Sequence, residues 1–357
     1  MLSVCIITKN EEKNIERCLK ALSGYGFELV VIDTGSTDGT MEIARQYTDK
    51  LYEFTWQDNF SAAKNYAISK ASHDLVLIVD SDEFLQPLSK TDIKNLETMA
   101  HQNPDDVGRI RRRNVFTKDG THQENREWIN RIFDRRKFHY EGRIHEQVVS
   151  FKHQEYQTWL SPLIFLHTGY DLSPEERKQK TQRNITLLEQ ELSTVTSKVE
   201  IPYLLYQLGK SHYMAGNYGQ ACEYFARGLS YDLNPKLEYV IDMVETYGYA
   251  LLNDAREQEA LFFENIYHEF GNSADFQFLM GLIYMKNARF DMAVAEFEKA
   301  LRQADCRNVG VNSFAAAYNI GVIYECLGQL DNARKFYEKC GDYAPAKERL
   351  GEILPKI

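Results

Sequence analysis

The sequence has little of what marks fibrous, disordered or membrane-spanning chains. Its 357 residues include only 8 prolines and 20 glycines, which excludes collagen-like and low-complexity classes. No apolar run reaches the roughly 18 to 20 residues that a membrane span requires. The first apolar stretch, residues 2–8, has neither a basic region before it nor a cleavage site after it, as a secretory signal would have. We therefore expect a folded cytoplasmic protein with no membrane span.

Cysteine is also sparse, and positive charge is in the minority. The 6 cysteines show no CxxC spacing, which favours reduced thiols over a disulfide framework. The net charge of −10 argues against a protein whose main role is to bind nucleic acid. Residues 109–146 depart from this average, with eleven Lys or Arg against six Asp or Glu. We expect some of their arginines to line an anionic or acceptor cleft; RNA binding is less favoured because no aromatic platform accompanies them.

The first 80 residues alternate short apolar runs with amphipathic segments. Strand-like runs occupy residues 2–7, 28–32 and 75–79, and segments of helical periodicity occupy residues 11–22, 40–47 and 61–70. This alternation predicts a mostly parallel sheet covered by helices on both faces. Ligands of such sheets bind beyond the carboxyl ends of the strands, and a polar loop follows each of the three runs.

The second half is predicted to be helical, and it repeats. Ser173 and Pro174, followed by two glutamates, are typical of a helix N-terminus. Four later segments share an apolar residue followed by glycine, with alanine twelve residues after the glycine and an aromatic residue four further on in all but the second segment. The four glycines are Gly209, Gly248, Gly281 and Gly321. The pattern resembles the tetratricopeptide repeat, a pair of helices that touch at small residues; an irregular helical bundle is the alternative.

The change of period divides the chain into parts. We expect an α/β domain over residues 1–170, a connecting helix over 171–199, and an all-α repeat domain over 200–357 that ends in a capping helix at 344–353. Stacked repeats of this kind present a concave groove. The repeat domain is therefore predicted to bind a partner or to form a homodimer.

Two carboxylates stand one residue apart where the third strand-like run opens into a loop, in the segment Asp80-Ser81-Asp82. Carboxylate oxygens with open coordination positions suit a divalent metal, Mg²⁺ or Mn²⁺, that bridges phosphates. On its own the motif is weak, because acidic turns after strands are common.

Three motifs in order resemble those of the family-two inverting glycosyltransferases, which have the Rossmann-like GT-A fold. They are SVCIITKNEE at residues 3–12, VIDTGSTDGT at 31–40 and IVDSDE at 78–83. The resemblance implies a UDP-sugar donor whose nucleoside is held by Thr8, Asn10, Glu11, Asp33, Asp80 and Ser81. It also implies that Asp82 coordinates the metal on the diphosphate. For the segment 33–40 a structural role is open as well, since its glycines and polar residues can shape a turn and cap the next helix.

Further along the chain, the resemblance extends to residues beside the phosphates and the acceptor. Lys64, in FSAAKN at 60–65, is similar to the family's basic residue facing the pyrophosphate; a solvated helix lysine is the alternative. An inverting transfer needs a base on the acceptor side, and Glu146 is the candidate, in a block where His145-Glu146 replaces the family's acidic pair. The alternative for Glu146 is a surface ion pair with Arg131 or Arg143. Arg131 is itself predicted to bind substrate.

The resemblance also implies that a histidine late in the domain completes the metal site. His167 ends an apolar strand and is preferred over His145, because neutral imidazole is a competent ligand and His167 lies at a strand end. A hydrogen-bonded core histidine is the structural alternative for His167.

These expectations combine into one predicted activity. The chain is expected to transfer a sugar, glucose or N-acetylglucosamine, from a UDP-sugar to a peptide or protein side chain held with help from the repeats. The peptide acceptor rests on a resemblance to bacterial enzymes that glycosylate bacteriocins. Two alternatives stay open: transfer to lipopolysaccharide or another cell-envelope glycan, and a non-catalytic scaffold in which a degenerate transferase domain carries the repeats.

Overall fold

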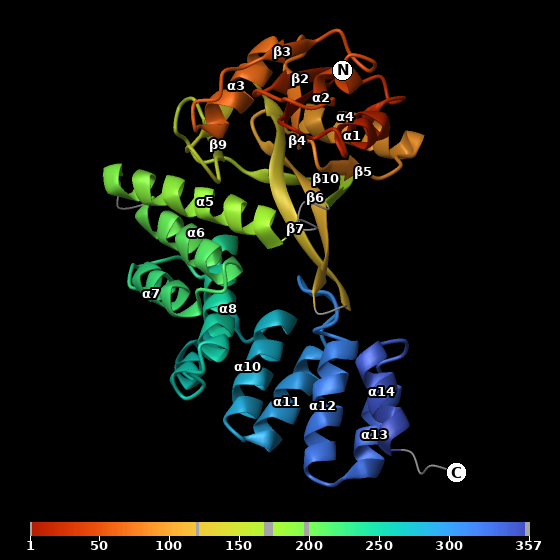
Figure 1. The fold of residues 1–357 in the computed structure, drawn as a ribbon, viewed down its shortest axis with the longest axis vertical. Helices are drawn as coiled ribbons and strands as arrows, with labels where there is room; N and C mark the ends of the chain where they lie inside the picture. The colour runs from red at the N-terminus through yellow and green to blue at the C-terminus, as the bar shows by residue number, and fades with distance from the viewer. Residues whose placement is uncertain (1, 119–120, 168–173, 196–199, 354–357) are drawn as a thin grey trace. The chain divides into compact units, whose positions relative to one another are not determined.

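The computed structural model describes residues 2–118, 121–167, 174–195 and 200–353. The chain divides into two compact units, Met1–Arg177 and Lys178–Ile357 (Figure 1). The predicted boundaries at 170/171 and 199/200, and the predicted cap at Ser173, lie outside the described residues and stay predictions.

Within the described residues before α5, the N-terminal unit contains ten strands and four helices. The strands are β1 (Ser3–Thr8), β2 (Glu28–Asp33), β3 (Leu51–Glu53), β4 (Leu75–Asp80), β5 (Glu83–Leu85), β6 (Val107–Lys118), β7 (Thr121–Asp134), β8 (Phe138–Glu141), β9 (Gln147–Ser150) and β10 (Thr158–His167). The helices are α1 (Ile15–Leu22), α2 (Thr40–Ala44), α3 (Phe60–Lys70) and α4 (Lys90–Gln102).

Eight of the strands form one sheet in the order β3-β2-β1-β4-β7-β6-β10-β5, and β8 pairs with β9 in a separate hairpin. The pairs β3·β2, β2·β1, β1·β4 and β6·β10 are parallel, whereas β4·β7, β7·β6 and β10·β5 are antiparallel. The predicted α/β fold with a mostly parallel first half is therefore confirmed.

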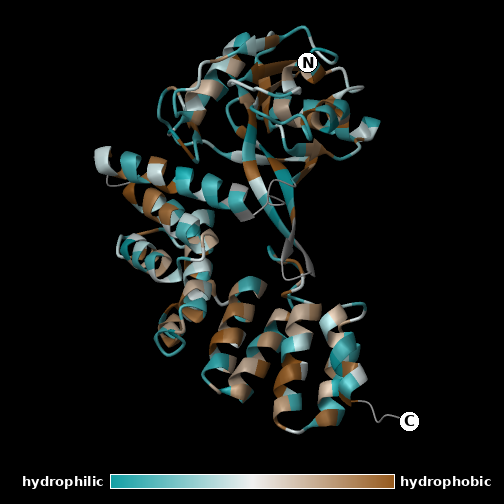
Figure 2. Ribbon diagram, viewed as in Figure 1, coloured by the Kyte–Doolittle hydropathy of each residue, from teal (hydrophilic) through white to brown (hydrophobic). Residues whose placement is uncertain are grey.

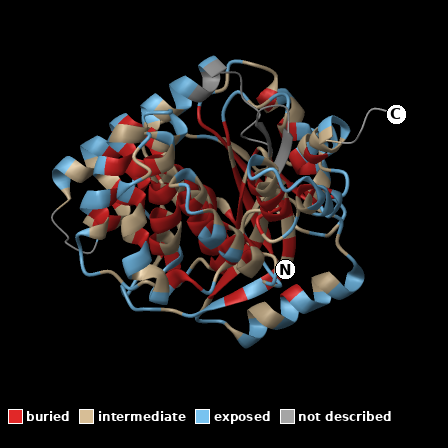
Figure 3. Ribbon diagram, turned by 90° about the horizontal axis from the view of Figure 1, so that it is seen from below, coloured by how far each residue is buried: buried red, intermediate tan, exposed pale blue. Residues whose placement is uncertain are grey.

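The central strands are buried on both faces, as their continuous apolar runs predict. Alternate residues point to opposite sides: Val4 and Ile6 of β1 join the cluster that α1, α2 and α4 cover, whereas Cys5 joins the cluster beneath α3 and the β8·β9 hairpin. Figure 2 shows the apolar strands at the centre of this unit, and Figure 3 shows them as buried while the covering helices keep exposed outer faces. All six cysteines of the chain are free thiols.

Helix α1 begins at Ile15, later than the periodicity predicts. The backbone N–H groups of Glu11 and Glu12 instead donate to the side chains of Thr40, at 2.8 Å, and Asp38, at 3.3 Å. The loop after β1 is thereby tied to the loop after β2, at the end of the sheet where the predicted site lies.

Helix α5 (Pro174–Thr194) spans the division, and the helices of the C-terminal unit follow it. They are α6 (Ile201–Met214), α7 (Tyr218–Leu229), α8 (Glu238–Asn253), the 3₁₀ helix η1 (Glu259–Ile266), α9 (Tyr267–Phe270), α10 (Ala274–Lys286), α11 (Phe290–Ala300), α12 (Phe314–Cys326), α13 (Leu330–Glu338) and α14 (Ala344–Ile353). Helix α14 matches the predicted capping helix.

The repeated glycines mark the points where paired helices touch. A Cβ added at Gly209, Gly281 or Gly321 would lie 2.5 to 2.6 Å from the ring sixteen residues further on, which belongs to Phe225, Phe297 or Tyr337. Each of these rings therefore packs directly on backbone, which is why glycine and a bulky residue recur at this spacing.

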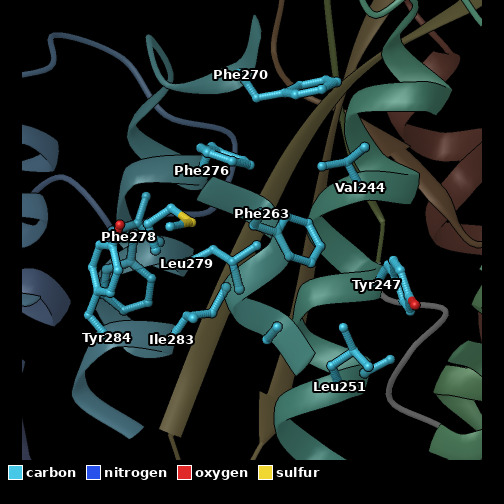
Figure 4. Close-up of a cluster of buried hydrophobic side chains, with 14 of the residues drawn as sticks. Val244, Tyr247, Leu251, Phe263, Phe270, Phe276, Phe278, Leu279, Ile283 and Tyr284 are labelled. Atoms are coloured by element: carbon cyan, nitrogen blue, oxygen red, sulfur yellow. The ribbon is translucent and has the colours of Figure 1, made fainter. Parts of the chain in front are cut away.

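The second copy departs from this arrangement, because its second helix is replaced by η1 and the short α9. Gly248 faces Leu279 of the following repeat instead of a residue of its own copy. Phe263 of η1 and Phe276 of α10 lie in one buried cluster with Val244 and Leu251 of α8 (Figure 4). The bulky residue that the pattern lacks at Glu264 is thus supplied from neighbouring positions.

Candidate active site

The predicted donor-binding residues gather where three neighbouring parallel strands end. Thr8 at the end of β1 is paired in register with Asp33 at the end of β2, and Ile7 is paired with Asp80 at the end of β4. The carboxyl ends of adjacent parallel strands meet at one edge, which is where this class of sheet binds ligands. The fold therefore brings Thr8, Asp33 and Asp80 together, as the sequence predicts.

Asp33 accepts hydrogen bonds from the loop that follows it. Its Oδ2 accepts the backbone N–H groups of Gly35 and Ser36, each at 2.9 Å, and its Oδ1 accepts the hydroxyl of Ser36. Gly35 has a φ of 104°, which favours glycine there. A structural role for this segment is therefore present and includes Asp33 itself.

The loop after β1 is held against the same segment. Asn10 has a φ of 54°, a left-handed conformation that Asn tolerates, and its Oδ1 accepts the Thr37 N–H at 2.8 Å. Glu11 accepts from the Asn14 side-chain amide at 2.7 Å. Within the described residues the buried hydroxyl of Thr8 has no hydrogen-bond partner. These contacts leave Thr8 as the residue of this loop best suited to an additional ligand contact.

Asp80 is the centre of a charged cluster. Its Oδ2 accepts from Arg131 Nη2 at 2.6 Å, and its Oδ1 lies 3.5 Å from Lys64 Nζ. Burial by itself would raise the pKa of Asp80, but the positive charges of Arg131 and Lys64 hold that pKa well below its usual range. Asp80 is therefore a carboxylate at neutral pH, as a ligand-binding role requires. Ser81, next along the chain, is buried.

Lys64 is buried, so the alternative of a solvated helix lysine is wrong. Its Nζ forms an ion pair with Glu146, in the β8–β9 connection, and stands 5.2 Å from the ring centre of Tyr140. Burial alone would lower the pKa of Lys64, but the charges of Asp80 and Glu146 raise it. Helix α3 is fixed at its start, where Asn59 accepts the Ala62 N–H at 2.9 Å.

The partner of Glu146 differs from both alternatives drawn from the sequence. Among the described contacts, neither Arg131 nor Arg143 forms an ion pair with Glu146. Lys64 forms that pair instead, and it is not a surface pair, because the Glu146 side chain is only 12% exposed. Arg131 instead binds Asp80. Its Nε and Nη1 atoms are buried and have no hydrogen-bond partner within the described residues.

Asp82 and His167 lie side by side, with 3.3 Å between Oδ2 and Nε2. His167 Nδ1 is 2.7 Å from Asn114 Oδ1, while the Asn114 amide group donates to Glu127 at 2.6 Å. Because the Asn114 amide nitrogen is used by Glu127, Asn114 Oδ1 accepts from His167 Nδ1, and Nε2 is the ring nitrogen that faces Asp82.

Asp82 Oδ2 and His167 Nε2 are the two atoms here that would ligate a divalent metal. A carboxylate oxygen and an imidazole nitrogen are both ligands for Mn²⁺, and a ring nitrogen is less suited to Mg²⁺. Across the described part of the chain, no group of three or more His, Cys, Asp or Glu side chains could hold a metal. Asp82 and His167 would therefore supply two ligands and leave positions open for phosphate oxygens.

Three residues that are not predicted site residues, Glu83, Arg112 and Asn114, also lie in this cluster. Glu83 is fully buried and accepts from Arg112 Nη1 at 3.1 Å and Arg131 Nη2 at 3.3 Å. Glu83 belongs to the same IVDSDE motif as Asp80, which is the signal that could have identified it. Arg112 and Asn114 lie two residues apart on β6, so the alternation of a strand would have placed them on one face.

The basic stretch at 109–146 is largely neutralised within the sheet. Arg112 pairs with Glu83 and Glu127, and Arg113 pairs with Glu124 at 2.6 Å. Arg112 and Arg113 are thus paired with carboxylates of neighbouring strands, and the lining of an acceptor cleft by some arginines of the stretch stays a prediction. Arg131, which binds Asp80, is the arginine of the stretch that the sequence predicts to bind substrate.

These features define a class of protein: an α/β unit whose carboxylates and cations gather beyond the ends of parallel strands, joined to a unit of helical repeats. Residues 3–153 match the family Glycosyl transferase family 2, and residues 203–227, 274–304 and 314–347 match Tetratricopeptide repeat families. The N-terminal unit is a glycosyl transferase family 2 domain, and the C-terminal unit contains tetratricopeptide repeats. The resemblance drawn from the sequence motifs is confirmed.

Curated relatives agree with this assignment. A TPR repeat-containing protein of Synechococcus elongatus is 24% identical over 335 residues, which cover 92% of this chain and 72% of that protein. The SPbeta prophage-derived glycosyltransferase SunS of Bacillus subtilis is 26% identical over 227 residues, 63% of this chain and 52% of SunS. The chain thus spans about half the length of SunS. An uncharacterized glycosyltransferase of Rickettsia typhi is 34% identical over 101 residues, 28% of this chain and 34% of that protein.

Among solved structures, MamA aligns with a TM-score of 0.38 at 19% identity and covers 51% of this chain and 98% of its own. S. aureus TarS aligns with a TM-score of 0.35 at 16% identity and covers 72% of this chain and 53% of its own.

Within the described residues, no helix combines the length and the apolar character that crossing a membrane requires.

Proposed function

We propose that this protein is a metal-dependent inverting glycosyltransferase that moves glucose or N-acetylglucosamine from a UDP-sugar to a peptide or protein side chain. The observation that carries the proposal is the pair Asp82–His167, in which a carboxylate oxygen and a ring nitrogen face each other at 3.3 Å. This arrangement supports binding of Mn²⁺ or Mg²⁺ next to a diphosphate.

The donor site is assigned to the strand ends and their cations. Thr8, Asn10, Glu11 and Asp33 shape the nucleoside pocket, with Asp80 and Ser81 at its edge. Lys64 and Arg131 supply positive charge beside Asp80, and the two unpartnered N–H-bearing atoms of Arg131 suit an anionic ligand. The bound metal would stabilise negative charge on the departing diphosphate.

Glu146 is assigned as the base. Its carboxylate accepts the proton of the acceptor nucleophile as the nucleophile bonds to the anomeric carbon and UDP leaves from the opposite face. The buried cation Lys64 holds Glu146 in place before the reaction. Lys64 therefore orients the base and also faces the donor-side carboxylate Asp80.

The acceptor is assigned from the repeats. Stacked tetratricopeptide helices present a groove suited to extended polypeptide, and SunS is a glycosyltransferase relative of this chain. A homodimer through the repeats is compatible with this role and would be detected by light scattering.

The test is release of UDP from a panel of UDP-sugars by the purified chain, with Mn²⁺, with Mg²⁺ and with a chelator. Metal-dependent release from one UDP-sugar is expected, and transfer to peptides would then be followed by mass spectrometry. Transfer to a lipid-linked saccharide but to no peptide would overturn the peptide acceptor in favour of a cell-envelope glycan. Absence of both release and metal-dependent UDP binding would favour the scaffold.

A further inference from the structure

Glu83 lies where the two sides of the candidate site meet. It begins β5, directly opposite His167 on β10, and His167 is in turn opposite Asn114 on β6. The Glu83 side chain is completely buried. It therefore cannot touch a substrate, and any role it has is exerted through its neighbours.

Both oxygens of Glu83 are used by donors. Oε1 accepts from Arg112 Nη1 at 3.1 Å and from Arg131 Nη2 at 3.3 Å, and Oε2 accepts the backbone N–H of Asp80 at 3.1 Å. The contact from Arg131 is shared, because the same Nη2 donates to Asp80 Oδ2. Glu83 thus fixes Asp80 twice, once through its backbone and once through Arg131.

A second line of contacts leads from Glu83 to the metal pair. Arg112 bridges Glu83 to Glu127, with Nη2 donating to Glu127 at 2.8 Å. Glu127 accepts the Asn114 amide, and Asn114 sets the proton position on His167. The nitrogen that faces Asp82 is therefore oriented by a line of hydrogen bonds that begins at Glu83.

Burying the Glu83 carboxylate is energetically unfavourable, which argues that Glu83 has a role beyond stability. Withdrawing a carboxylate from water costs several kcal/mol, and apolar residues of similar size often fill such a space at least as well. Phe84 and Leu85, the next residues of β5, are apolar members of the adjoining core. An apolar residue at 83 would extend that core but would leave Arg112 and Arg131 without their shared carboxylate.

We propose that Glu83 is a positioning residue that holds the donor-side carboxylate Asp80 and the metal pair Asp82–His167 in register. The proposal rests on the proposed function, since it assigns Glu83 a task in metal-assisted binding of the UDP-sugar. Outer partners of metal ligands typically contribute about 10- to 100-fold in metal affinity or activity.

Glu83→Gln tests the proposal with little change in shape. All three partners of Glu83 are donors, so the amide group of Gln would face a donor in either orientation. We expect the Mn²⁺ concentration that gives half-maximal UDP binding in calorimetry to rise about tenfold or more. Thermal unfolding of the variant shows whether it is fully folded at the assay temperature, because partial unfolding would also raise the apparent Mn²⁺ concentration.

Two further variants complete the test: a second substitution in the same line of contacts and a control. Arg112→Lys keeps the charge but loses the fork that joins Glu83 to Glu127, and it should raise the same Mn²⁺ concentration even if Glu83→Gln fails to fold. Glu28→Gln is the matched control. Glu28 is also held by several hydrogen bonds, but it lies at the opposite end of the strands, so this variant should bind UDP and Mn²⁺ as wild type does.

The outcomes separate the two proposals. If Glu83→Gln and Arg112→Lys are folded and both bind UDP with the Mn²⁺ dependence of wild type, the proposed role of Glu83 is overturned, whereas the proposed function is not. No metal-dependent UDP binding by wild type would overturn the proposed function and, with it, this inference.

Discussion

Lys64 and Glu146 form a buried ion pair although they lie 82 residues apart in the sequence. Lys64 comes from α3, on one face of the sheet, and Glu146 from the connection between β8 and β9. Their side chains are 5% and 12% exposed. Since Lys64 also faces Asp80, one ammonium group connects the candidate base to the donor-side carboxylate.

Lys64→Met should destabilise the protein, because it leaves the Glu146 carboxylate buried without its cation. Breaking a buried pair from one side costs about 3 to 5 kcal/mol. The double variant Lys64→Met/Glu146→Gln should recover part of this loss without recovering activity. Urea unfolding of the single and double variants measures the coupling; additive losses would show that the pair does not matter for stability.

Glu146→Gln alone should bind the donor almost as wild type does but transfer the sugar about 100-fold more slowly or worse, since a general base typically contributes 10²- to 10⁴-fold. Initial rates of transfer and calorimetric binding of UDP separate the two effects. An unchanged transfer rate would move the base to another residue.

Asp82→Asn and His167→Gln should each abolish most metal-dependent turnover of the donor while leaving the fold intact. Each removes one of the two atoms that face each other across the proposed metal position. Turnover at increasing Mn²⁺ is the measurement, with thermal unfolding to verify folding. Asp291→Asn, at an exposed position of α11, is the control and should behave as wild type; full activity of the Asp82 variant would remove the metal assignment.

Glu28 should make stability depend on pH in acid. Burial by itself would raise the pKa of Glu28, but hydrogen bonds with Lys50, Ser3 and Ser72 lower it from 4.5 to about 2. Between these values the unfolded chain binds the proton and the folded chain does not, so the stabilisation is complete above pH 4.5 and disappears as the pH falls toward 2. The shift corresponds to at most about 3 kcal/mol, reduced by the partial exposure of Lys50.

The corresponding measurement is the difference in free energy of unfolding between wild type and Glu28→Gln as a function of pH. The difference should be largest at neutral pH and shrink toward pH 2. A constant difference would mean that Glu28 contributes through packing rather than charge.

Two glycine-to-alanine substitutions in the C-terminal unit should change the free energy of unfolding in opposite directions. Gly281→Ala would place a methyl group 2.6 Å from the Phe297 ring, and such overpacking costs about 1 to 3 kcal/mol. Gly351→Ala, in α14, has nothing within 4 Å and should gain about 0.5 to 1 kcal/mol from the lower backbone entropy of alanine. Thermal unfolding of the two variants tests this; a stabilised Gly281→Ala would mean that α10 and α11 can move apart at little cost.

The sequence by itself determined the elements and the edge of the sheet where ligands bind. Alternating apolar runs predict strands that end directly before Thr8, Asp33 and Asp80, because hydrophobic period is a local property of a chain. The glycine spacing likewise predicts helix pairs, because in three of the four copies the residue that touches the glycine lies sixteen positions further along the same repeat.

Only the tertiary structure determines which charged side chains lie next to one another. His167 and Asp82 are 85 residues apart, and Arg131 and Asp80 are 51 apart, so no local pattern specifies their pairing. The partner of a buried charge depends on which strands become neighbours and on which face its side chain lies. For the same reason Glu83, which no periodicity distinguishes from any other acidic residue after a strand, acquires its place between the two arginines only when β5 pairs with β10.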